Sequence, residues 1–157
     1  MMSAEEDEMF MRIALEEAAL AAAEGEVPVG AVMVRGGTVV AREHNRVEAA
    51  KLGSAHAELL CIDAASRALD YWRLDDCTLY VTKEPCPMCA GGIVLARLDA
   101  LVWGVSDPKR GGGTEFGIFS HPGINHHPKV VAGVMEDECR LVLQRFFRER
   151  REEQKRP

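Results

Sequence analysis

The sequence lacks any run of apolar residues long enough to cross a bilayer, although 47% of its 157 residues are hydrophobic. Its start also lacks the basic character of a secretory signal, because residues 5–8 are all acidic. We therefore expect a cytoplasmic protein that makes no contact with a membrane. A chain of this length suits one core, so we expect residues 1–157 to form a single domain.

Cysteine is present but shows no pairing pattern typical of disulfides. The five cysteines are an odd number and nothing indicates export, so we expect no disulfide framework. Cys61, Cys77 and Cys139 stand alone in apolar stretches, where a cysteine usually serves as a small buried side chain. Cys86 and Cys89 differ, because they form a Cys-x-x-Cys pair that needs its own explanation.

Positive charge is not in excess, since the formal net charge is -6, and this argues mildly against a general affinity for nucleic acid. The charge is unevenly spread, however, with acidic residues at the start and basic residues at the end: Arg145, Arg148, Arg150, Arg151, Lys155 and Arg156. This asymmetry is compatible with one local phosphate-binding surface. Glutamates interleave with the arginines, so a plain solvated helix end is the simpler interpretation.

Short helical and β-rich segments alternate along the chain. Apolar spacing predicts helices over residues 9–23, 54–68, 88–98 and 136–151, with Ser54 as the N-cap of the second. Strands are expected at residues 27–34 and 38–41, which form a hairpin around Gly36-Gly37, and at 77–82, 100–105 and 130–131. This order predicts an α/β fold, a three-layer α/β/α sandwich around a mixed sheet of about five strands.

Two short motifs carry the chemistry, namely His56-Ala57-Glu58 and Pro85-Cys86-Pro87-Met88-Cys89. Cys86 and Cys89 lie three residues apart in the first turn of a predicted helix, so both thiols can face one point. A helix N-terminus also favours the thiolate form, which binds metal. Together with His56 they supply three corners of a zinc tetrahedron. No second Cys-x-x-Cys or His-x-x-x-His closes the fourth corner, which a catalytic zinc site keeps open for water.

Glu58 is the candidate for moving protons at this site. Zinc lowers the pKa of a bound water, and Glu58 can reach that water from two residues away without occupying the metal. A redox role for the cysteine pair lacks the context of a thioredoxin-like domain, and a structural zinc site would normally be closed. His-x-Glu combined with Pro-Cys-x-x-Cys matches the known signature of zinc-dependent nucleobase deaminases.

At these residues the chain resembles the cytidine/deoxycytidylate deaminase superfamily, and within it the bacterial tRNA-specific adenosine deaminases. The resemblance covers almost the whole chain, through residues 26–32, 45–46, 55–58, 79–91, 121–126 and 146–148. It implies a hydrolase acting on a cyclic amidine C–N bond. The implied reaction converts adenosine to inosine at the wobble position of a tRNA anticodon and releases ammonia.

The resemblance also implies a homodimer that binds a tRNA anticodon stem-loop. Each subunit would hold one Zn²⁺ through His56, Cys86 and Cys89, with Glu58 as the catalytic proton shuttle. The implied substrate contacts are Asn45 to the target base, Ala57 and Pro85 in the pocket wall, Asp107 and Lys109 at the anticodon backbone, and Arg148 near the RNA. The simpler interpretations are that Asn45 and Asp107 shape turns and that Arg148 is a surface charge.

Two other functions stay open. A deaminase of free guanine or cytosine would use the same zinc chemistry, so the motif cannot separate it, although the Asn125 region and the basic C-terminus favour RNA. A non-catalytic, zinc-stabilised RNA-binding module would need neither Glu58 nor an open metal position. Residues 47–53 and Lys83 depart from the family pattern, which makes RNA docking at 47–53 uncertain.

Overall fold

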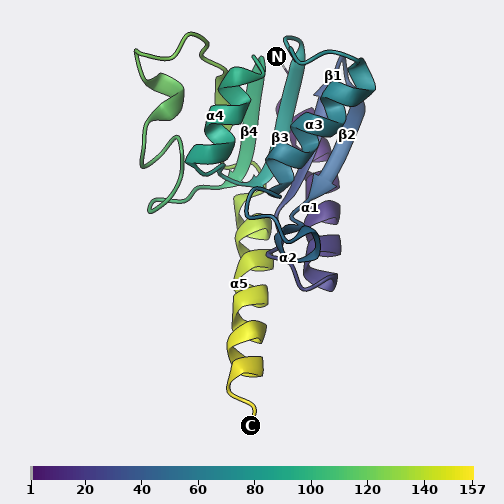
Figure 1. Ribbon diagram of the computed structural model, residues 1–157, viewed down its shortest axis with the longest axis vertical. Helices are drawn as coiled ribbons and strands as arrows, with labels where there is room; N and C mark the ends of the chain where they lie inside the picture. The colour runs from purple at the N-terminus through teal and green to yellow at the C-terminus, as the bar shows by residue number, and fades with distance from the viewer. Residues whose placement is uncertain (1) are drawn as a thin grey trace.

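The computed structural model describes residues 2–157, which are built around one five-stranded sheet (Figure 1). The strands are β1 (Gly30–Arg35), β2 (Thr38–His44), β3 (Cys77–Lys83), β4 (Ala100–Val105) and β5 (Lys129–Ala132). Their order in the sheet is β2-β1-β3-β4-β5. β1 is antiparallel to β2 and β3, whereas β3, β4 and β5 are parallel. The predicted mixed sheet of about five strands is therefore confirmed.

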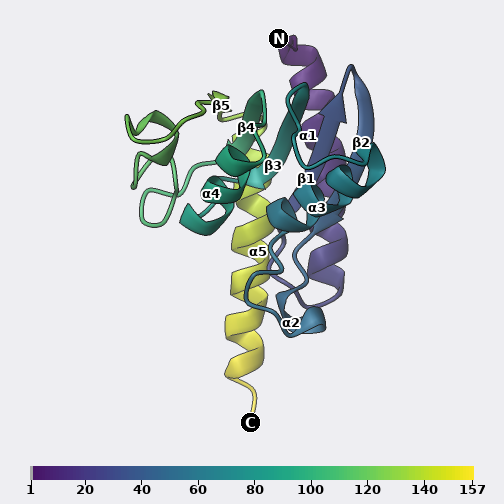
Figure 2. The same cartoon turned by 45° about the horizontal axis from the view of Figure 1, so that its top comes forward.

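Helices cover both faces of the sheet, as Figures 1 and 2 show. α1 (Ala4–Ala23) and α5 (Glu136–Gln154) pack on one face, and α3 (Ala57–Leu69) and α4 (Pro87–Leu95) pack on the other. The predicted three-layer sandwich is thus confirmed. The C-terminal half of α5 extends beyond the rest of the molecule (Figure 1). Nowhere in residues 2–157 is a helix both long and apolar enough to cross a membrane.

The central strands are apolar on both faces. In β3, Leu79 and Val81 join the core under α3 and α4, whereas Tyr80 joins the core under α1. Successive side chains of a strand point to opposite faces, so each helical layer buries its own half of the strand. The Tyr80 hydroxyl donates a hydrogen bond to Asp7 Oδ1 at 2.7 Å, which satisfies both buried groups.

Glycines allow two helices to approach the sheet closely. A Cβ on Gly30 would collide with the backbone of α1 at Ala14, and one on Gly104 would collide with Cys139 Sγ in α5 and with the carbonyl oxygen of Thr82. The helices therefore rest directly on the strand backbone. Larger side chains at these two positions would push α1 or α5 away from the sheet.

Several predicted boundaries were wrong. α1 begins at Ala4, five residues earlier than predicted, because Ser3 and Glu6 form a capping box that satisfies the first turn. α3 begins at Ala57 with His56 as its N-cap, and Ser54 lies outside the helix. The polar segment 42–54, for which no element was predicted, contains the end of β2 and the short α2 (Val47–Ala50). Neither stretch has apolar residues at a regular helical or strand spacing. A 3-10 turn at Ile118–Ser120 was not predicted.

An ionic cluster joins α1 to the end of β2. The ring of His44 lies 3.0 Å from Glu17 Oε1 and 3.0 Å from Glu24 Oε2, and Arg42 Nε donates to Glu17 Oε2 at 2.7 Å. Burial acts to lower the pKa of His44, but the two carboxylates outweigh it and raise the pKa. Burial likewise opposes ionisation of Glu17, yet its hydrogen bonds to His44 and Arg42 lower the pKa of its carboxyl.

Candidate active site

The candidate site lies where two helices begin, beside the carboxyl end of strand β3. His56 is the N-cap of α3, and Cys86 is the N-cap of α4, with Pro87 in the first helical turn. Cys89 follows one turn later and is buried. Open α/β sheets bind ligands at this edge because the chain leaves each strand there to enter a helix. The prediction that both motifs meet at helix N-termini is confirmed.

The three proposed ligand atoms converge. His56 Nδ1 is 3.6 Å from Cys86 Sγ and 3.4 Å from Cys89 Sγ, and all three atoms lie within 4.8 Å of one another. Zinc bonds of about 2.3 Å to sulfur and about 2.0 Å to nitrogen, at tetrahedral angles, separate these ligand atoms by about 3.6 Å. The side chains therefore fit one tetrahedral zinc ion. Among the described residues, this is the one group of three such side chains with metal-binding geometry.

The pKa values of the two thiols are shifted in opposite directions. The hydrogen bond from Cys89, together with one from His56, outweighs burial and lowers the pKa of Cys86 to about 3. The hydrogen bond to Cys86 raises the pKa of Cys89, and burial raises it further. The hydrogen bond to Cys86 also raises the pKa of His56, against the effect of burial. The lowered pKa favours the thiolate form of Cys86, which is the form that binds metal.

Glu58 lies in the first turn of α3 and is only 4% exposed. Burial raises the pKa of its carboxyl, and the side chain is hydrogen-bonded with the thiol of Cys89, which places it beside the ligand cluster. A carboxyl whose pKa is raised holds a proton more readily, as a group that accepts and then donates a proton must. Its position and environment therefore suit proton transfer, as the sequence predicts.

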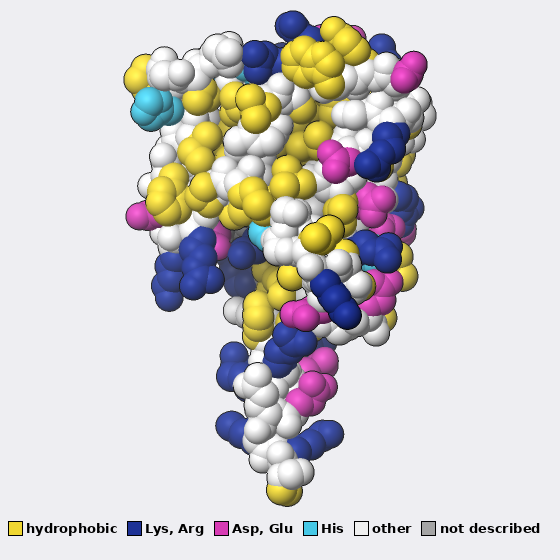
Figure 3. All heavy atoms as spheres, in the orientation of Figure 1, with side chains coloured by type: hydrophobic (Ala, Val, Ile, Leu, Met, Phe, Trp, Pro, Cys, Tyr) yellow, Lys and Arg dark blue, Asp and Glu magenta, His cyan; other side chains and the backbone are white. Residues whose placement is uncertain are grey.

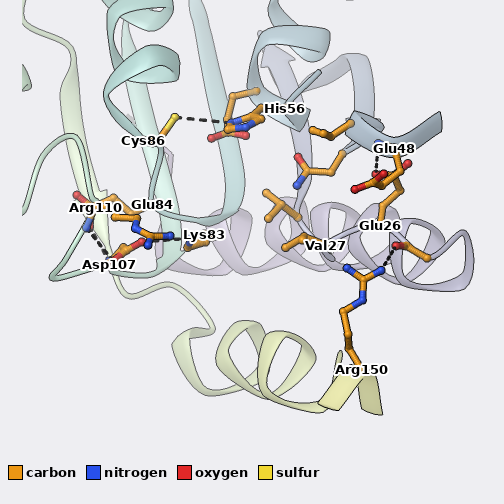
Figure 4. A pocket seen from close by; sticks show the side chains of 15 residues that line it. Glu26, Val27, Glu48, His56, Lys83, Glu84, Cys86, Asp107, Arg110 and Arg150 are labelled. Carbon is orange, nitrogen blue, oxygen red and sulfur yellow. Dashed lines mark hydrogen bonds and ion pairs between the residues drawn. The ribbon is translucent and has the colours of Figure 1, made fainter. Parts of the chain in front are cut away.

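A pocket of about 290 Å³ opens onto these residues (Figure 4). His56, Glu58 and Cys86 line it together with Asn45. The volume is near the lower limit of the roughly 300–1,000 Å³ that small-molecule pockets have, which suits a group about the size of one nucleobase. Asn45 Oδ1 accepts a hydrogen bond from the backbone N–H of Ala57 at 2.8 Å, so its amide NH₂ is left as a donor. Asn45 therefore shapes the chain and can still meet a ligand.

The other predicted contacts lie at different depths. Asp107 lines the pocket, whereas Lys109 is exposed and lies outside the lining. Ala57 and Pro85, which were expected in the pocket wall, are buried and are not among the residues that line the pocket. Arg148 lies in a separate groove on α5, beside Phe147. The structure thus brings Asn45 and Asp107 together with the metal-binding cluster but leaves Lys109 and Arg148 farther out.

Sequence reasoning missed one acidic anchor and one ion pair at the pocket. Buried Glu26 accepts hydrogen bonds from the backbone N–H groups of Glu48 and Ala49, at 3.0 and 2.8 Å, and so holds α2 in place. Lys83 Nζ lies 3.2 Å from Asp107 Oδ2, which explains a cation just before the Glu-Pro-Cys run. These contacts join segments far apart in the chain, so no local pattern could predict them.

Arg110 and Arg150 also line the pocket, and neither was predicted as a contact. The Arg150 guanidinium donates to the carbonyl oxygen of Gly25 at 3.2 Å (Figure 4). It also lies 4.9 Å from the ring centroid of Phe146. Arg148 is two positions earlier on the same helix, which turns it by about 200° to another side. The basic composition of the C-terminal segment could not show that Arg150 lines the pocket and Arg148 does not.

This fold, with one histidine and two cysteines that could hold a metal ion beside a buried glutamate, defines a deaminase of the cytidine-deaminase-like class. The MafB19-like deaminase family matches residues 5–151. The tRNA-specific adenosine deaminase of Bacillus subtilis (strain 168) is 49% identical over 151 residues, which cover 96% of this chain and 94% of that protein. The chain belongs to the family of tRNA-specific adenosine deaminases.

Solved structures agree with this membership. One, from a study of A-to-I editing by tRNA:A34 deaminases at the wobble position of transfer RNA, has a TM-score of 0.84 and 43% identity, over 86% of this chain and 99% of that one. A guanine deaminase from Bacillus subtilis is more distant, with a TM-score of 0.62 and 32% identity, over 78% of this chain and 82% of that one.

Proposed function

We propose that this protein hydrolyses adenosine to inosine at the wobble position of a tRNA anticodon and releases ammonia. The observation that carries the proposal is the pocket, in which the ligand cluster and Glu58 share a cavity suited to one base. The near-full-length similarity to a tRNA-specific adenosine deaminase favours this substrate over a free base. Anticodon-loop bases are already unpaired, so extruding one is at the low end of a cost of a few kcal/mol. A tRNA substrate also favours the cytoplasmic location expected from the sequence.

Zinc is the metal that best suits the site, because two cysteine sulfurs and one imidazole nitrogen form a donor set that zinc favours. His56, Cys86 and Cys89 would hold one ion per chain. When bound, zinc supplies the Lewis acidity that makes a water molecule nucleophilic near neutral pH.

Glu58 carries the protons in the proposed reaction. Its carboxylate takes a proton from the attacking water and gives it to the ring nitrogen beside C6, while the oxygen bonds to C6. Glu58 then moves the proton of the new C6 hydroxyl to the amino group, the C–N bond breaks and ammonia leaves. The burial that raises the pKa of Glu58 helps the carboxyl to hold each proton between the two transfers.

The pocket also offers groups for the rest of the substrate. The amide NH₂ of Asn45 would donate to the target base, while its Oδ1 remains bonded to the backbone of Ala57. Lys83, Arg110 and Arg150 place cations around the same pocket, where they suit nearby phosphates in spite of the net charge of -6. Lys109 and Arg148 would then make outer contacts with the RNA.

The active form is proposed to be a homodimer. Figure 3 shows apolar side chains gathered on the face that α3 and α4 cover. On α4, Met88 near the site is 43% exposed and Leu95 at the other end of the helix is 69% exposed, and an apolar patch of this kind suits a protein interface. A second copy would bury them, and RNA could then touch both subunits. Light scattering of the purified protein measures the mass directly.

The decisive test offers the zinc-loaded protein an anticodon stem-loop with wobble adenosine, and in parallel free guanine and free cytosine. A matched stem-loop with wobble guanosine controls for other adenosines in the loop. Inosine formed only at the wobble position supports the proposal. Ammonia from a free base with intact RNA would favour a free-base deaminase, and RNA binding without any deamination would favour a binding module.

A further inference from the structure

A buried carboxylate beside the site has no part in the metal cluster or in proton transfer. Glu84 follows β3 and precedes Pro85-Cys86, and its side chain is only 3% exposed. It lines the pocket between β3 and the segment at residues 107–114 (Figure 4). A buried carboxylate is costly unless it is fully hydrogen-bonded, so its partners indicate its purpose.

All four side-chain hydrogen bonds of Glu84 come from the segment at residues 107–114. Oε1 accepts the backbone N–H of Asp107 at 2.9 Å and the hydroxyl of Thr114 at 2.7 Å. Oε2 accepts the backbone N–H groups of Gly113 at 3.0 Å and Thr114 at 2.6 Å. Because the acceptor is charged, these bonds are stronger than neutral ones. One side chain therefore ties both ends of the loop to the strand that leads to Cys86.

The loop is shaped to fit closely around this carboxylate. A Cβ on Gly111 would collide with the carboxyl group of Glu84, and one on Gly113 would lie 3.1 Å from Glu84 Oε2. The backbone N–H of Gly112 donates to the carbonyl oxygen of Pro85 at 2.7 Å. The run of three glycines thus lets the backbone approach Glu84 and Pro85 where any side chain would interfere.

The same loop presents two polar side chains to the pocket, Asp107 and Arg110. Asp107 Oδ1 accepts the backbone N–H groups of Lys109 and Arg110, both at 3.0 Å, and Asp107 Oδ2 pairs with Lys83. The carboxylate of Glu84 fixes the backbone of Asp107, and the side chain of Asp107 in turn fixes the backbone of Arg110. Figure 4 shows Asp107, Arg110 and Glu84 on one side of the pocket.

We propose that Glu84 is a positioning residue for substrate binding, which holds the 107–114 loop so that Asp107 and Arg110 meet the RNA beside the target base. This inference rests on the proposed tRNA function. Although Glu84 lines the pocket, both of its carboxylate oxygens are bonded to the 107–114 loop, so it acts through the loop on how tightly the RNA binds. A purely structural carboxylate would instead alter stability and leave the binding of RNA unchanged.

Glu84→Gln tests the role with little change in shape. The amide replaces one acceptor oxygen with an NH₂ group that faces N–H or O–H donors, so at least one side of the loop loses its anchor. We expect KM for the wobble-adenosine stem-loop to rise about tenfold, with kcat within about threefold of wild type. Zinc content should stay at one per chain. Thr114→Val removes a single donor and should raise KM in the same direction by less.

Two further variants separate positioning from stability. Tyr80→Phe loses a buried hydrogen bond on the other face of the sheet, so it lowers the melting temperature without raising KM. Arg110→Ala should raise KM, and the double variant with Glu84→Gln should raise it by less than the product of the two single effects, because both act through one loop.

The proposal is overturned if KM of Glu84→Gln is unchanged, if only kcat falls, or if Tyr80→Phe raises KM equally. Should Glu84→Gln fail to fold or to hold zinc, an unchanged KM in Thr114→Val overturns the proposal, and a raised KM supports it. Wild-type protein that forms no inosine would contradict the tRNA function instead, so the two failures are distinguishable.

Discussion

Glu58→Gln separates the proton-transfer role of Glu58 from any role in holding the fold. Glutamine has nearly the same volume, so it fits the space at the start of α3, where the carboxyl is 4% exposed. It removes the one property that the mechanism needs, which is the ability to accept and release a proton. The ligands His56, Cys86 and Cys89 are untouched by this change.

The size of the effect follows from the number of steps that Glu58 serves. A general acid or base at one step contributes about 10²–10⁴ in rate, and Glu58 serves two transfers in sequence. We therefore expect kcat to fall by at least about 10⁴, equal to about 5.5 kcal/mol of activation free energy. The free energy of unfolding should change by less than about 1 kcal/mol, because an uncharged amide avoids the cost of burying an ionisable carboxyl.

The assay is single-turnover deamination of the wobble-adenosine stem-loop, with zinc content and melting temperature measured on the same sample. Asp63→Asn is the matched control, since it removes one negative charge from an exposed position on the same helix. It should retain wild-type activity. A Glu58→Gln protein that keeps its zinc and remains within tenfold of the wild-type rate would refute the proposed role.

Three further outcomes are expected. Cys86→Ser should reduce bound zinc, measured by elemental analysis, from one per chain towards none, whereas Cys61→Ser should retain it; equal zinc in both would exclude Cys86 as a ligand. The folded-state pKa of His44 is raised above its ordinary value of 6.5, so its contribution is fully present below pH 6.5 and lost as the pH rises through the raised pKa. The stability advantage of wild type over His44→Gln in urea unfolding should therefore shrink as the pH rises above 6.5, and an advantage that grows with pH would contradict the proposed ionic cluster. Gly104→Ala should lower the free energy of unfolding by about 1–3 kcal/mol, because the new Cβ would overlap its neighbours. Gly91→Ala on α4 has open space at its Cβ and should raise the free energy of unfolding by about 0.5–1 kcal/mol. Thermal melts in which Gly104→Ala is the more stable variant would contradict the close packing at Gly104.

The metal-binding cluster could be predicted because its logic is mostly local. Cys86 and Cys89 are separated by one helical turn, so the sequence itself places both thiols on one side of α4. The strands of the sheet were predictable for a similar reason, since apolar and β-branched runs mark them without reference to the rest of the chain. Local capping was less visible, and α1 and α3 both begin at residues other than those predicted.

Only the tertiary structure decided which distant segments of the chain are in contact. Glu84 and Thr114 are 30 residues apart, and Arg150 reaches Gly25 across 125 residues. Helix periodicity and residue type say nothing about such pairs, because the packing of the sheet and its helices determines which loops meet. The sequence by itself therefore determined the chemistry at His56, Cys86 and Glu58. The fold alone decided which charged side chains surround that chemistry, because their positions depend on how all three layers pack together.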